Sequence, residues 1–327
     1  MAKLVTIFGG SGFVGRYIAR RMAKQGWRVR VAVRRPNEAL FVKTYGVVGQ
    51  VEPILCNIRN DASVDEALNG ADAAVNCVGI LIEEKKNTFS AVQHGGAERI
   101  GRLSKKHGIK SLVHISAIGA DENSKSIYSS TKAKGENAIV SNFPNAIILR
   151  PSIVFGQEDQ FFNRFAKMAT MAPFLPLVGA NTRFQPVFVD DVAKAAEAAL
   201  LGSLQEGTYE LGGPEIKDFR ELMIDMLRII KRRRLIINTP RFIAKLMAFG
   251  LSTLQLFTLG LFKNSIITKD QIENLGIDNI VSEQAKGFKN LNLDPLDMGS
   301  VLPEYLWRYR PSGQYDAIKD SAKNLRS

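Results

Sequence analysis

The amino-acid sequence predicts an α/β fold with a doubly wound parallel sheet and a smaller, partly interleaved C-terminal α/β lobe. Two observations support this prediction. Apolar strand patterns alternate with helical patterns through the first half of the chain, as in βαβ units. A glycine-rich turn also joins the first strand pattern directly to the first helix pattern. Because βαβ crossovers are right-handed, successive helices are expected on both faces of the sheet.

Each element of the first half is predicted from apolar runs and helical periodicity. The helix Phe13–Lys24 places Val14, Ile18 and Met22 on one face and ends at Gly26. A second helix is expected over Phe89–Lys106, ending at Gly108. The predicted strands are Leu4–Phe8, Arg28–Val33, Val51–Leu55, Ala73–Val78, Ser111–Ser116 and Ala146–Arg150.

Beyond Pro151 the pattern changes to irregular loops with embedded helices. Short strands are expected at Val187–Val189 and Thr208–Leu211, with a helix between them that runs to Leu201. Asp190 or Asp191 would cap that helix. A further helix should open with a capping box, because Glu221 follows Asp218 at the required spacing.

Composition places the chain among ordinary globular proteins and limits its partners. Of its 327 residues, 45% are hydrophobic and 23% charged, so disorder is not expected. The net charge of +12 makes an anionic partner plausible, but no nucleic-acid-binding module is recognisable and nucleic acid is not expected. Cys56 and Cys77 are the only cysteines, which fits a reducing compartment. The N-terminal residues lead directly into a strand, as expected for a bacterial cytoplasmic protein or a mitochondrial matrix protein without its leader.

The turn after the first strand has the glycine spacing of a Rossmann-type dinucleotide site. Gly9 permits the tight turn, Gly12 lets backbone approach a pyrophosphate, and Gly15 allows the helix to pack closely on the strand. The pyrophosphate would accept hydrogen bonds at the positive end of the helix. The residues expected to bind it are Gly9, Ser11, Gly12, Phe13, Val14 and Gly15.

The residues after the second strand favour NADP(H) over NAD(H). NAD-preferring sites usually carry an acidic residue there, whereas this sequence has Arg34 and Arg35. A guanidinium can form charge-assisted hydrogen bonds with a 2′-phosphate, and Arg34 is the principal candidate. Asn57 and Ile58, after the third strand, are expected to border the adenine. Cys77, Val78 and Gly79, after the fourth strand, would pass along the cofactor ribose.

Tyr128 and Lys132 form the Y-x-x-x-K pair of short-chain dehydrogenases. Residues four apart share one face of a helix, so both side chains can reach the nicotinamide ribose. A neighbouring ammonium lowers the pKa of a tyrosine and makes it a usable acid or base. Ser116, which ends the preceding strand, is also expected among the cofactor-binding residues.

Further motifs give the chain a family resemblance. The stretch from Arg150 to Gly156 resembles the R-P-x-x-V-x-G element of extended and atypical short-chain dehydrogenases. Residues 189–193 (VDDVA) and 211–214 (LGGP) are similar to later elements of that superfamily. The resemblance implies that Pro151 and Ile153 are among the cofactor-binding residues.

A narrower resemblance covers nearly the whole chain. The stretch from Phe155 to Phe161 (FGQEDQF) is similar to the F-G-x-E-D-x-F stretch of the NADPH-binding accessory subunits of respiratory complex I (alpha-subcomplex subunit 9 type). Residues 184–187, 267–270 and the Tyr- and Arg-rich stretch 305–309 fit that branch too. The resemblance implies an accessory subunit of NADH:ubiquinone oxidoreductase that holds NADPH without established turnover. It also implies a position near the quinone site, where the peripheral arm meets the membrane arm.

One departure from the active enzymes argues against catalysis. Active extended enzymes carry Ser or Thr just past the fifth strand, whereas here Ile118 takes that position and Ser116 comes about two residues early. Because a lost donor of this kind removes transition-state stabilisation, no catalytic residues are expected. Tyr128, Lys132 and Ser116 are then vestigial, and the first two act as ribose ligands. The three histidines lack ligand spacing, so no metal site is expected.

Two other functions stay open. One is a soluble NADP-dependent reductase or epimerase of the extended or atypical type. The other is a redox-sensing regulator that binds NADP without turnover and has a soluble partner.

The chain divides into an NADP(H)-binding domain over residues 1–155 and a C-terminal lobe over 156–327, some elements of which return to the first lobe. Within the lobe, residues 228–262 combine a basic run, Lys231–Arg234, with an apolar segment, Phe242–Phe262, in which 14 of 21 residues are apolar. Three interpretations of this segment remain open. Residues 231–262 could form an interfacial segment docked on lipid or on a partner, a buried helix pair, or a true membrane span. Docking on lipid would make the protein peripheral on the cytoplasmic face of a bacterial inner membrane, or on the matrix side of the mitochondrial one.

Overall fold

The computed structural model describes residues 2–240, 242 and 269–315, which cluster into two compact units. The first unit contains the described residues up to Ser152, together with Val189–Gly212 and Val281–Pro295. The second contains the described residues of Ile153–Phe188, Gly213–Ile280 and Leu296–Ser327. Two segments from the second half of the chain therefore belong to the unit that carries the glycine turn.

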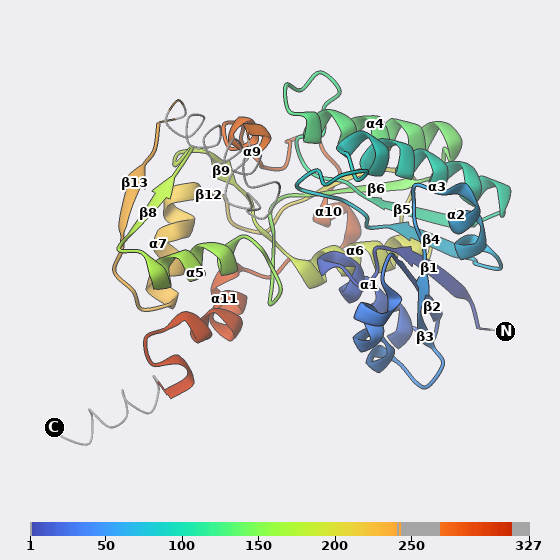
Figure 1. Cartoon of the computed structure of the whole chain (residues 1–327), viewed down its shortest axis with the longest axis horizontal. Helices are drawn as coiled ribbons and strands as arrows, with labels where there is room; N and C mark the ends of the chain where they lie inside the picture. The colour runs from blue at the N-terminus through green and yellow to red at the C-terminus, as the bar shows by residue number, and fades with distance from the viewer. Residues whose placement is uncertain (1, 241, 243–268, 316–327) are drawn as a thin grey trace. The chain divides into compact units, whose positions relative to one another are not determined.

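A seven-stranded, all-parallel sheet forms the centre of the first unit (Figure 1). Its strand order is β11-β6-β5-β4-β1-β2-β3, so the chain winds outward in both directions from β1 and β4. This order confirms the predicted doubly wound sheet. The strands are β1 (Leu4–Phe8), β2 (Arg28–Val33), β3 (Val51–Leu55), β4 (Ala73–Asn76), β5 (Ser111–Ile115), β6 (Ile147–Pro151) and β11 (Gly207–Leu211).

Helices cover both faces of this sheet, as the crossover rule requires. On one face α1 (Phe13–Lys24) packs against α6 (Val189–Leu200), and on the other α3 (Gly95–Lys106) packs against α4 (Ile127–Asn142) (Figure 1). The second face buries a core that includes Val64 and Ile100 against the strands. The remaining helical segments of this unit are η1 (Pro36–Tyr45), α2 (Asp61–Leu68), η2 (Ser90–His94) and α10 (Phe288–Leu291).

Several predicted boundaries are wrong by one or two residues. Strand β4 ends at Asn76, not Val78, because the Asn76 side-chain oxygen accepts the Val78 N–H at 3.0 Å and turns the chain. The helix expected from Phe89 begins as a π-helical turn, in which the Gly95 N–H bonds to the Ser90 carbonyl. Strand β5 ends at Ile115 and β6 runs one residue further than predicted, to Pro151.

The predicted cap of α6 is also wrong. The helix begins at Val189, so Asp190 and Asp191 lie in its first turn. Asp190 instead accepts two hydrogen bonds from Arg21 of α1, at 2.8 and 2.6 Å. The predicted capping box of Asp218 and Glu221 is confirmed at the start of α7 (Phe219–Ile229).

The second unit is built from short strand pairs and helices around a phenylalanine-rich core. Phe161 contacts four other phenylalanine rings, with centroid distances between 5.0 and 6.3 Å. The elements are β7 (Val154–Phe155), α5 (Phe162–Met171), β8 (Phe174–Leu177), β9 (Arg183–Phe184), β10 (Val187–Phe188), β12 (Lys217–Asp218), α7 (Phe219–Ile229), β13 (Leu235–Asn238), α9 (Lys269–Asn274), α11 (Met298–Leu306), η3 (Trp307–Tyr309) and η4 (Gly313–Tyr315).

A buried hydrogen bond ties the C-terminal helix to the F-G-x-E-D-x-F stretch of this unit. The hydroxyl of Tyr305 in α11 donates to the carboxylate of Asp159, which also accepts the N–H groups of Gly156 and Asn163. Both side chains are buried. The Tyr- and Arg-rich stretch is thus anchored to the interior of the second unit by the buried side chain of Tyr305.

The segment Phe242–Phe262 lies outside the described residues except for Phe242. Within the parts that the structure does describe, no helix is long and apolar enough to cross a membrane.

Candidate cofactor site

The turn between β1 and α1 has the backbone geometry that its glycines predict. Gly9 adopts φ +75°, a conformation that glycine reaches without steric cost, and its N–H donates to the Ala32 carbonyl of β2 at 2.9 Å. The Gly12 N–H closes the turn on the Gly9 carbonyl at 2.9 Å. A Cβ at Gly15 would lie only 2.5 Å from the Gly9 oxygen and 2.8 Å from the Gly10 Cα. Position 15 therefore admits only glycine while the helix packs this closely on the turn.

Helix α1 begins in a manner suited to an anion. Its N-cap, Gly12, is extended and supplies no side-chain hydrogen bond, and the first turn contains no acidic residue. By contrast, α2 and α4 in the same unit are capped by the side chains of Asn60 and Ser126. The N–H groups at the start of α1 can consequently bind a phosphate at the positive end of the helix. Ser11, Phe13 and Val14 are all partly exposed beside this turn.

The two arginines after β2 differ in their surroundings. Arg34 is exposed, and its guanidinium forms no ion pair with the described residues. Arg35 is bound to Glu38 at 3.0 Å, an exposed pair one turn apart. Arg34 is thus the one of the two that is available to a phosphate.

The sequence did not single out Arg16, which also borders the glycine turn. Its guanidinium donates to the Ser11 carbonyl at 3.0 Å and lies 4.9 Å from the centre of the Phe41 ring. The sequence signal that could have identified Arg16 is its position in the first turn of the helix that follows the glycine fingerprint.

Asn57 and Ile58 lie in the turn after β3, on the same edge of the sheet. The Asn57 side chain accepts the Arg59 N–H at 3.1 Å, which orders the turn. Ile58 is buried, and a Cβ at Gly96 would approach its Cδ1 to 2.6 Å. These contacts give the turn a fixed shape beside the end of β2.

The backbone after β4 passes close to Lys132. A Cβ placed on Gly79 would lie 3.6 Å from the Lys132 ammonium, and the Gly79 backbone is exposed. A Cβ on Gly9 would lie 3.2 Å from Val78 Cγ2 and 3.3 Å from the Cys77 carbonyl carbon. The turn after β1 and the turn after β4 are therefore neighbours. Burial raises the pKa of the Cys77 thiol to about 12, so this cysteine stays protonated at neutral pH.

Lys132 is held in place by the end of β5. Its ammonium donates to the Ile115 carbonyl at 3.0 Å, and the side chain is buried. Burial lowers its pKa to about 8, opposed by the nearby charge of Glu136. Glu136 itself binds Arg150 through three hydrogen bonds of 2.6 to 3.1 Å.

Tyr128 lies one turn before Lys132 on α4 and is partly exposed. Its ring packs edge-on against Phe89, with the ring centres 6.0 Å apart. The helix geometry places the two side chains on one face of α4.

Ser116 and Ile118 follow β5. The Ser116 hydroxyl is not exposed, and Ile118 has no hydroxyl. Ser116 is buried, and its hydroxyl has no hydrogen-bond partner within the described ranges. Ile118 is buried too, and its N–H donates to the Pro151 carbonyl at 3.0 Å. Position 118, where a catalytic hydroxyl is expected in active extended enzymes, thus carries a buried apolar side chain.

His114 has a structural partner within the sheet. Its Nδ1 lies 3.0 Å from the Asn76 amide, and burial lowers its pKa to about 3, so the ring is neutral at neutral pH.

Of the residues predicted to bind cofactor, Ile153 alone falls in the second unit. All of the others belong to the first unit.

The residues at these strand ends fit a dinucleotide. Backbone N–H groups and small residues line the turn for the pyrophosphate, and the exposed Arg34 guanidinium, which has no ion-pair partner among the described residues, follows β2. Lys132 and Tyr128 follow β5 on α4, where a ribose could accept or donate hydrogen bonds.

Comparisons with known proteins agree with this site. Residues 5–212 match the NAD dependent epimerase/dehydratase family. The dTDP-glucose 4,6-dehydratase of Bacillus anthracis in complex with NAD has the same fold, with a TM-score of 0.70 and 15% identity over 97% of this chain and 100% of that one.

Two curated relatives match over almost the whole chain. The mitochondrial NADH dehydrogenase [ubiquinone] 1 alpha subcomplex subunit 9 of Arabidopsis thaliana is 34% identical over 95% of this chain and 79% of its own length. The mitochondrial NADH-ubiquinone oxidoreductase 40 kDa subunit of Neurospora crassa is 32% identical over 98% of this chain and 83% of its own length. The chain therefore belongs to the NAD dependent epimerase/dehydratase family and, within it, to the group of the alpha subcomplex subunit 9 and 40 kDa subunits of NADH:ubiquinone oxidoreductase.

Proposed function

We propose that this chain is an NADPH-binding accessory subunit of a respiratory NADH:quinone oxidoreductase, at the junction of the peripheral and membrane arms near the quinone site. The observation that carries the proposal is the match to the subunits of this complex from a plant and a fungus, which extends over at least 95% of the chain. The match includes the second unit, beyond the family region that ends at residue 212.

The preference for NADPH over NADH rests on the end of β2. A carboxylate at this place would repel a 2′-phosphate and accept a hydrogen bond from a 2′-hydroxyl, whereas Arg34 offers a forked donor. Because Arg35 is paired with Glu38, Arg34 is the residue that we assign to the phosphate.

The cofactor is proposed to act as a structural ligand. Bound nicotinamide supplies a hydride donor or acceptor, but this chain offers Ile118 where a hydroxyl would polarise a substrate carbonyl. Loss of one such donor costs roughly 3 to 4 kcal/mol of transition-state stabilisation. A ligand that binds only the native state still stabilises it, by roughly 4 kcal/mol when its concentration is 1,000 times Kd. Tight binding can thus support assembly without turnover.

Membrane association is proposed through the basic and apolar residues 231–262, of which residues 231–240 and 242 are described. The outward residues Phe174 of β8 and Leu235 and Ile237 of β13 are 46, 67 and 41% exposed. Arg233 is exposed just before β13. Exposed apolar side chains beside a cation suit a surface of anionic lipid. The subunit would then lie peripherally on the cytoplasmic or matrix face.

Co-purification tests this proposal directly. Native membranes are dissolved in a mild detergent and separated by size, and fractions are assayed for NADH:quinone reductase activity and for the chain. We expect the chain to follow the activity peak. Recovery of the chain only in the soluble fraction at its native expression level would contradict the proposal.

A soluble NADP-dependent reductase or epimerase is the second candidate, because the Tyr128 and Lys132 pair is retained. The two residues lie one turn apart on α4, the spacing at which a tyrosine can serve as general acid or base beside a lysine. This alternative predicts an NADPH-consuming activity that Tyr128→Phe abolishes. Absence of any such activity on aldehyde, ketone and sugar-nucleotide substrates would exclude it.

A further inference from the structure

Positive charge is concentrated in the first 52 residues. The binding of a single dinucleotide does not account for this much positive charge. This stretch contains ten Lys and Arg residues and two acidic residues, Glu38 and Glu52. Residues 53–152 of the same unit contain twelve Lys and Arg residues and ten acidic residues. The excess of eight in the first stretch accounts for most of the chain's net charge of +12.

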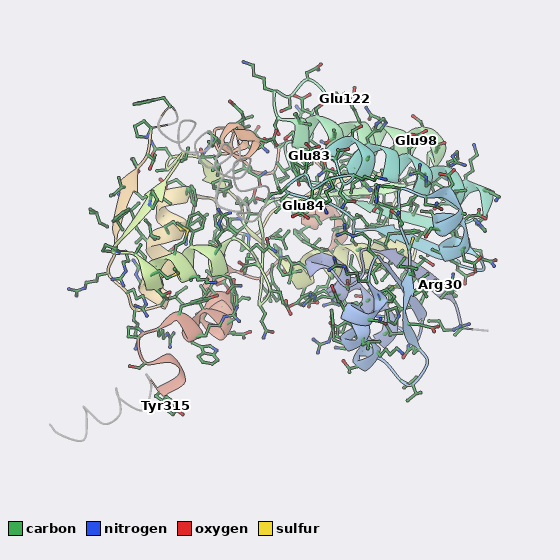
Figure 2. The ribbon with its side chains drawn as sticks, in the orientation of Figure 1. Arg30, Glu83, Glu84, Glu98, Glu122 and Tyr315 are labelled. Carbon is green, nitrogen blue, oxygen red and sulfur yellow. The ribbon has the colours of Figure 1, made fainter. Side chains whose placement is uncertain are left out.

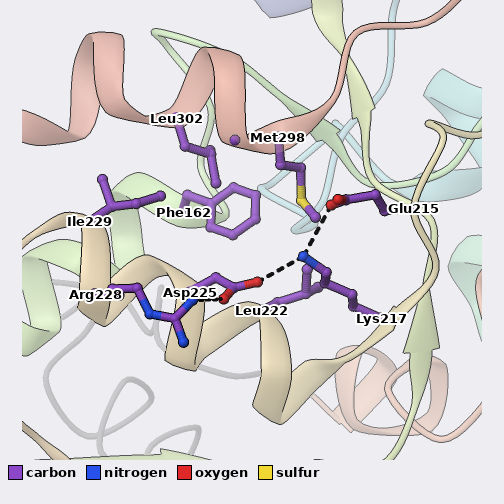
Figure 3. Close-up of a pocket in the computed structure, with 10 residues that line it drawn as sticks. Phe162, Glu215, Lys217, Leu222, Asp225, Arg228, Ile229, Met298 and Leu302 are labelled. Carbon is purple, nitrogen blue, oxygen red and sulfur yellow. Dashed lines mark hydrogen bonds and ion pairs between the residues drawn. The ribbon is translucent and has the colours of Figure 1, made fainter.

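Some of these cations have partners inside the first unit. Arg21 binds Asp190 and Glu197, at 2.6 and 2.8 Å, and so joins α1 to α6. Arg30 of β2, labelled in Figure 2, donates to two carbonyl groups at the end of α2, at 2.8 and 2.9 Å. Their charges are therefore used within the fold.

Four others have no such partner. Arg20 and Lys24 on α1, Arg28 at the start of β2 and Lys43 on η1 are all exposed. None of the four forms an ion pair with any residue in the described ranges. Arg20 and Lys24 are four residues apart, so they share one face of α1.

Exposed apolar side chains stand beside these cations. The Gln50 side chain donates to the Ala23 and Trp27 carbonyls, at 2.6 and 3.0 Å, and accepts the Val47 N–H at 2.9 Å. These bonds fix the turn of Val47 and Val48 against the end of α1, where Lys24 and Arg28 also lie. Val47 is 73% exposed and Val48 is fully exposed.

Segment η1 continues the same surface toward the start of α1. Leu40 is 51% and Phe41 40% exposed. The contact of the Arg16 guanidinium with the Phe41 ring, at 4.9 Å, places η1 next to the first turns of α1. The resulting basic-apolar surface consists of Arg20, Lys24, Arg28, Lys43, Leu40, Phe41, Val47 and Val48.

We propose that this basic-apolar surface docks on an acidic face of another polypeptide, which would be a neighbouring subunit if the proposed function holds. Apolar side chains surrounded by charges are typical of protein interfaces, in which the rim charges select the partner. The hydrogen bonds of Gln50 hold the Val47–Val48 turn in one conformation, so little ordering entropy is lost on docking. The four exposed cations form no ion pair with the residues that the structure describes, and an acidic partner would offer carboxylates to them.

The test uses the full-length chain in its native membranes. The variant Arg20→Gln/Lys24→Gln/Arg28→Gln/Lys43→Gln removes the four charges, and the matched control Lys86→Gln/Lys105→Gln/Lys125→Gln/Lys134→Gln removes four exposed charges elsewhere in the first unit. Thermal unfolding and NADPH affinity of both purified variants establish that the fold and the cofactor site are intact. The readouts are the amount of chain that migrates with NADH:quinone reductase activity and the products of a zero-length amine-to-carboxylate cross-linker.

We expect the surface variant to lose about tenfold or more of its association with the complex, and the control to associate like the wild type. Lys24 and Lys43 of the wild type should be cross-linked to Asp or Glu residues of another subunit. Normal association of the surface variant would overturn the inference. So would a variant that associates normally but no longer binds phosphatidylglycerol vesicles, because the surface would then face lipid. Absence of the wild-type chain from the complex would instead overturn the proposed function itself.

Discussion

Substitution of Gly15 by alanine tests the packing of the glycine turn most sharply. The new Cβ would lie 2.5 Å from the Gly9 carbonyl oxygen, and ordinary van der Waals contact begins at 3.4 Å. The start of α1 must then move by about 0.9 Å, because a densely packed turn has no void to accept the methyl group. Overpacking of this kind costs roughly 1 to 3 kcal/mol of stability.

The same movement should weaken cofactor binding. It displaces the N–H groups at the start of α1 from the phosphate, and a hydrogen bond to a charged group contributes roughly 1.5 to 3 kcal/mol. Loss of one such bond raises the Kd for NADPH by about 10- to 100-fold. Isothermal titration calorimetry with NADPH measures this change, and denaturant unfolding measures the loss of stability.

A matched control separates the two effects. Gly70 has φ +69° and open space around its Cβ position, so Gly70→Ala costs roughly 1 to 2 kcal/mol through backbone strain alone, outside the glycine turn. It should lower stability to a similar extent and leave the Kd unchanged. An unchanged Kd in Gly15→Ala, or an equal loss of affinity in both variants, would refute the packing argument.

Three other predictions follow from the site and from the second unit. Arg34→Ala should raise the Kd for NADPH by about tenfold or more and that for NADH little, whereas Arg35→Ala, which removes a paired and exposed cation, should change neither; calorimetry with both nucleotides decides. For Lys132, the folded-state pKa of about 8 lies below the ordinary 10.5, so the ammonium loses its proton as pH rises through 8. NADPH affinity should therefore fall above pH 8 in the wild type, and this decline should be absent in Lys132→Met; equal pH profiles would contradict the assigned contact. Tyr305→Phe leaves the buried Asp159 short of a donor and should destabilise the protein by roughly 1 to 3 kcal/mol in denaturant unfolding, while exposed Tyr315→Phe should not.

Sequence patterns predicted the seven strands of the central sheet to within two residues, because the strands are apolar runs. The strand Leu4–Phe8 and the helix Phe13–Lys24 have the predicted bounds, since each is set by an apolar run and a glycine. One error occurs where a side chain replaces a backbone bond. Asn76 ends β4 because its side-chain oxygen accepts the Val78 N–H. The amide nitrogen of the same side chain contacts His114 of β5, a contact that periodicity does not reveal.

The second unit was less predictable from sequence. Its strands are two to four residues long and pair across large separations, as β13 does with β8, so no local period identifies them. The role of Asp159 was likewise hidden, because its partner Tyr305 is 146 residues away. In the candidate site, Arg16 was missed since its contact with Phe41 depends on the position of η1 beside α1.

The nucleotide content of the purified full-length chain tests the central claim most directly. The chain is isolated without added cofactor, denatured, and the released nucleotides are separated and quantified against the protein. We predict close to one NADPH or NADP⁺ per chain, with NAD(H) in small amounts, and a loss of nucleotide in Gly15→Ala. A chain that carries no nicotinamide nucleotide, and that binds neither NADPH nor NADP⁺ when these are added, would contradict the claim.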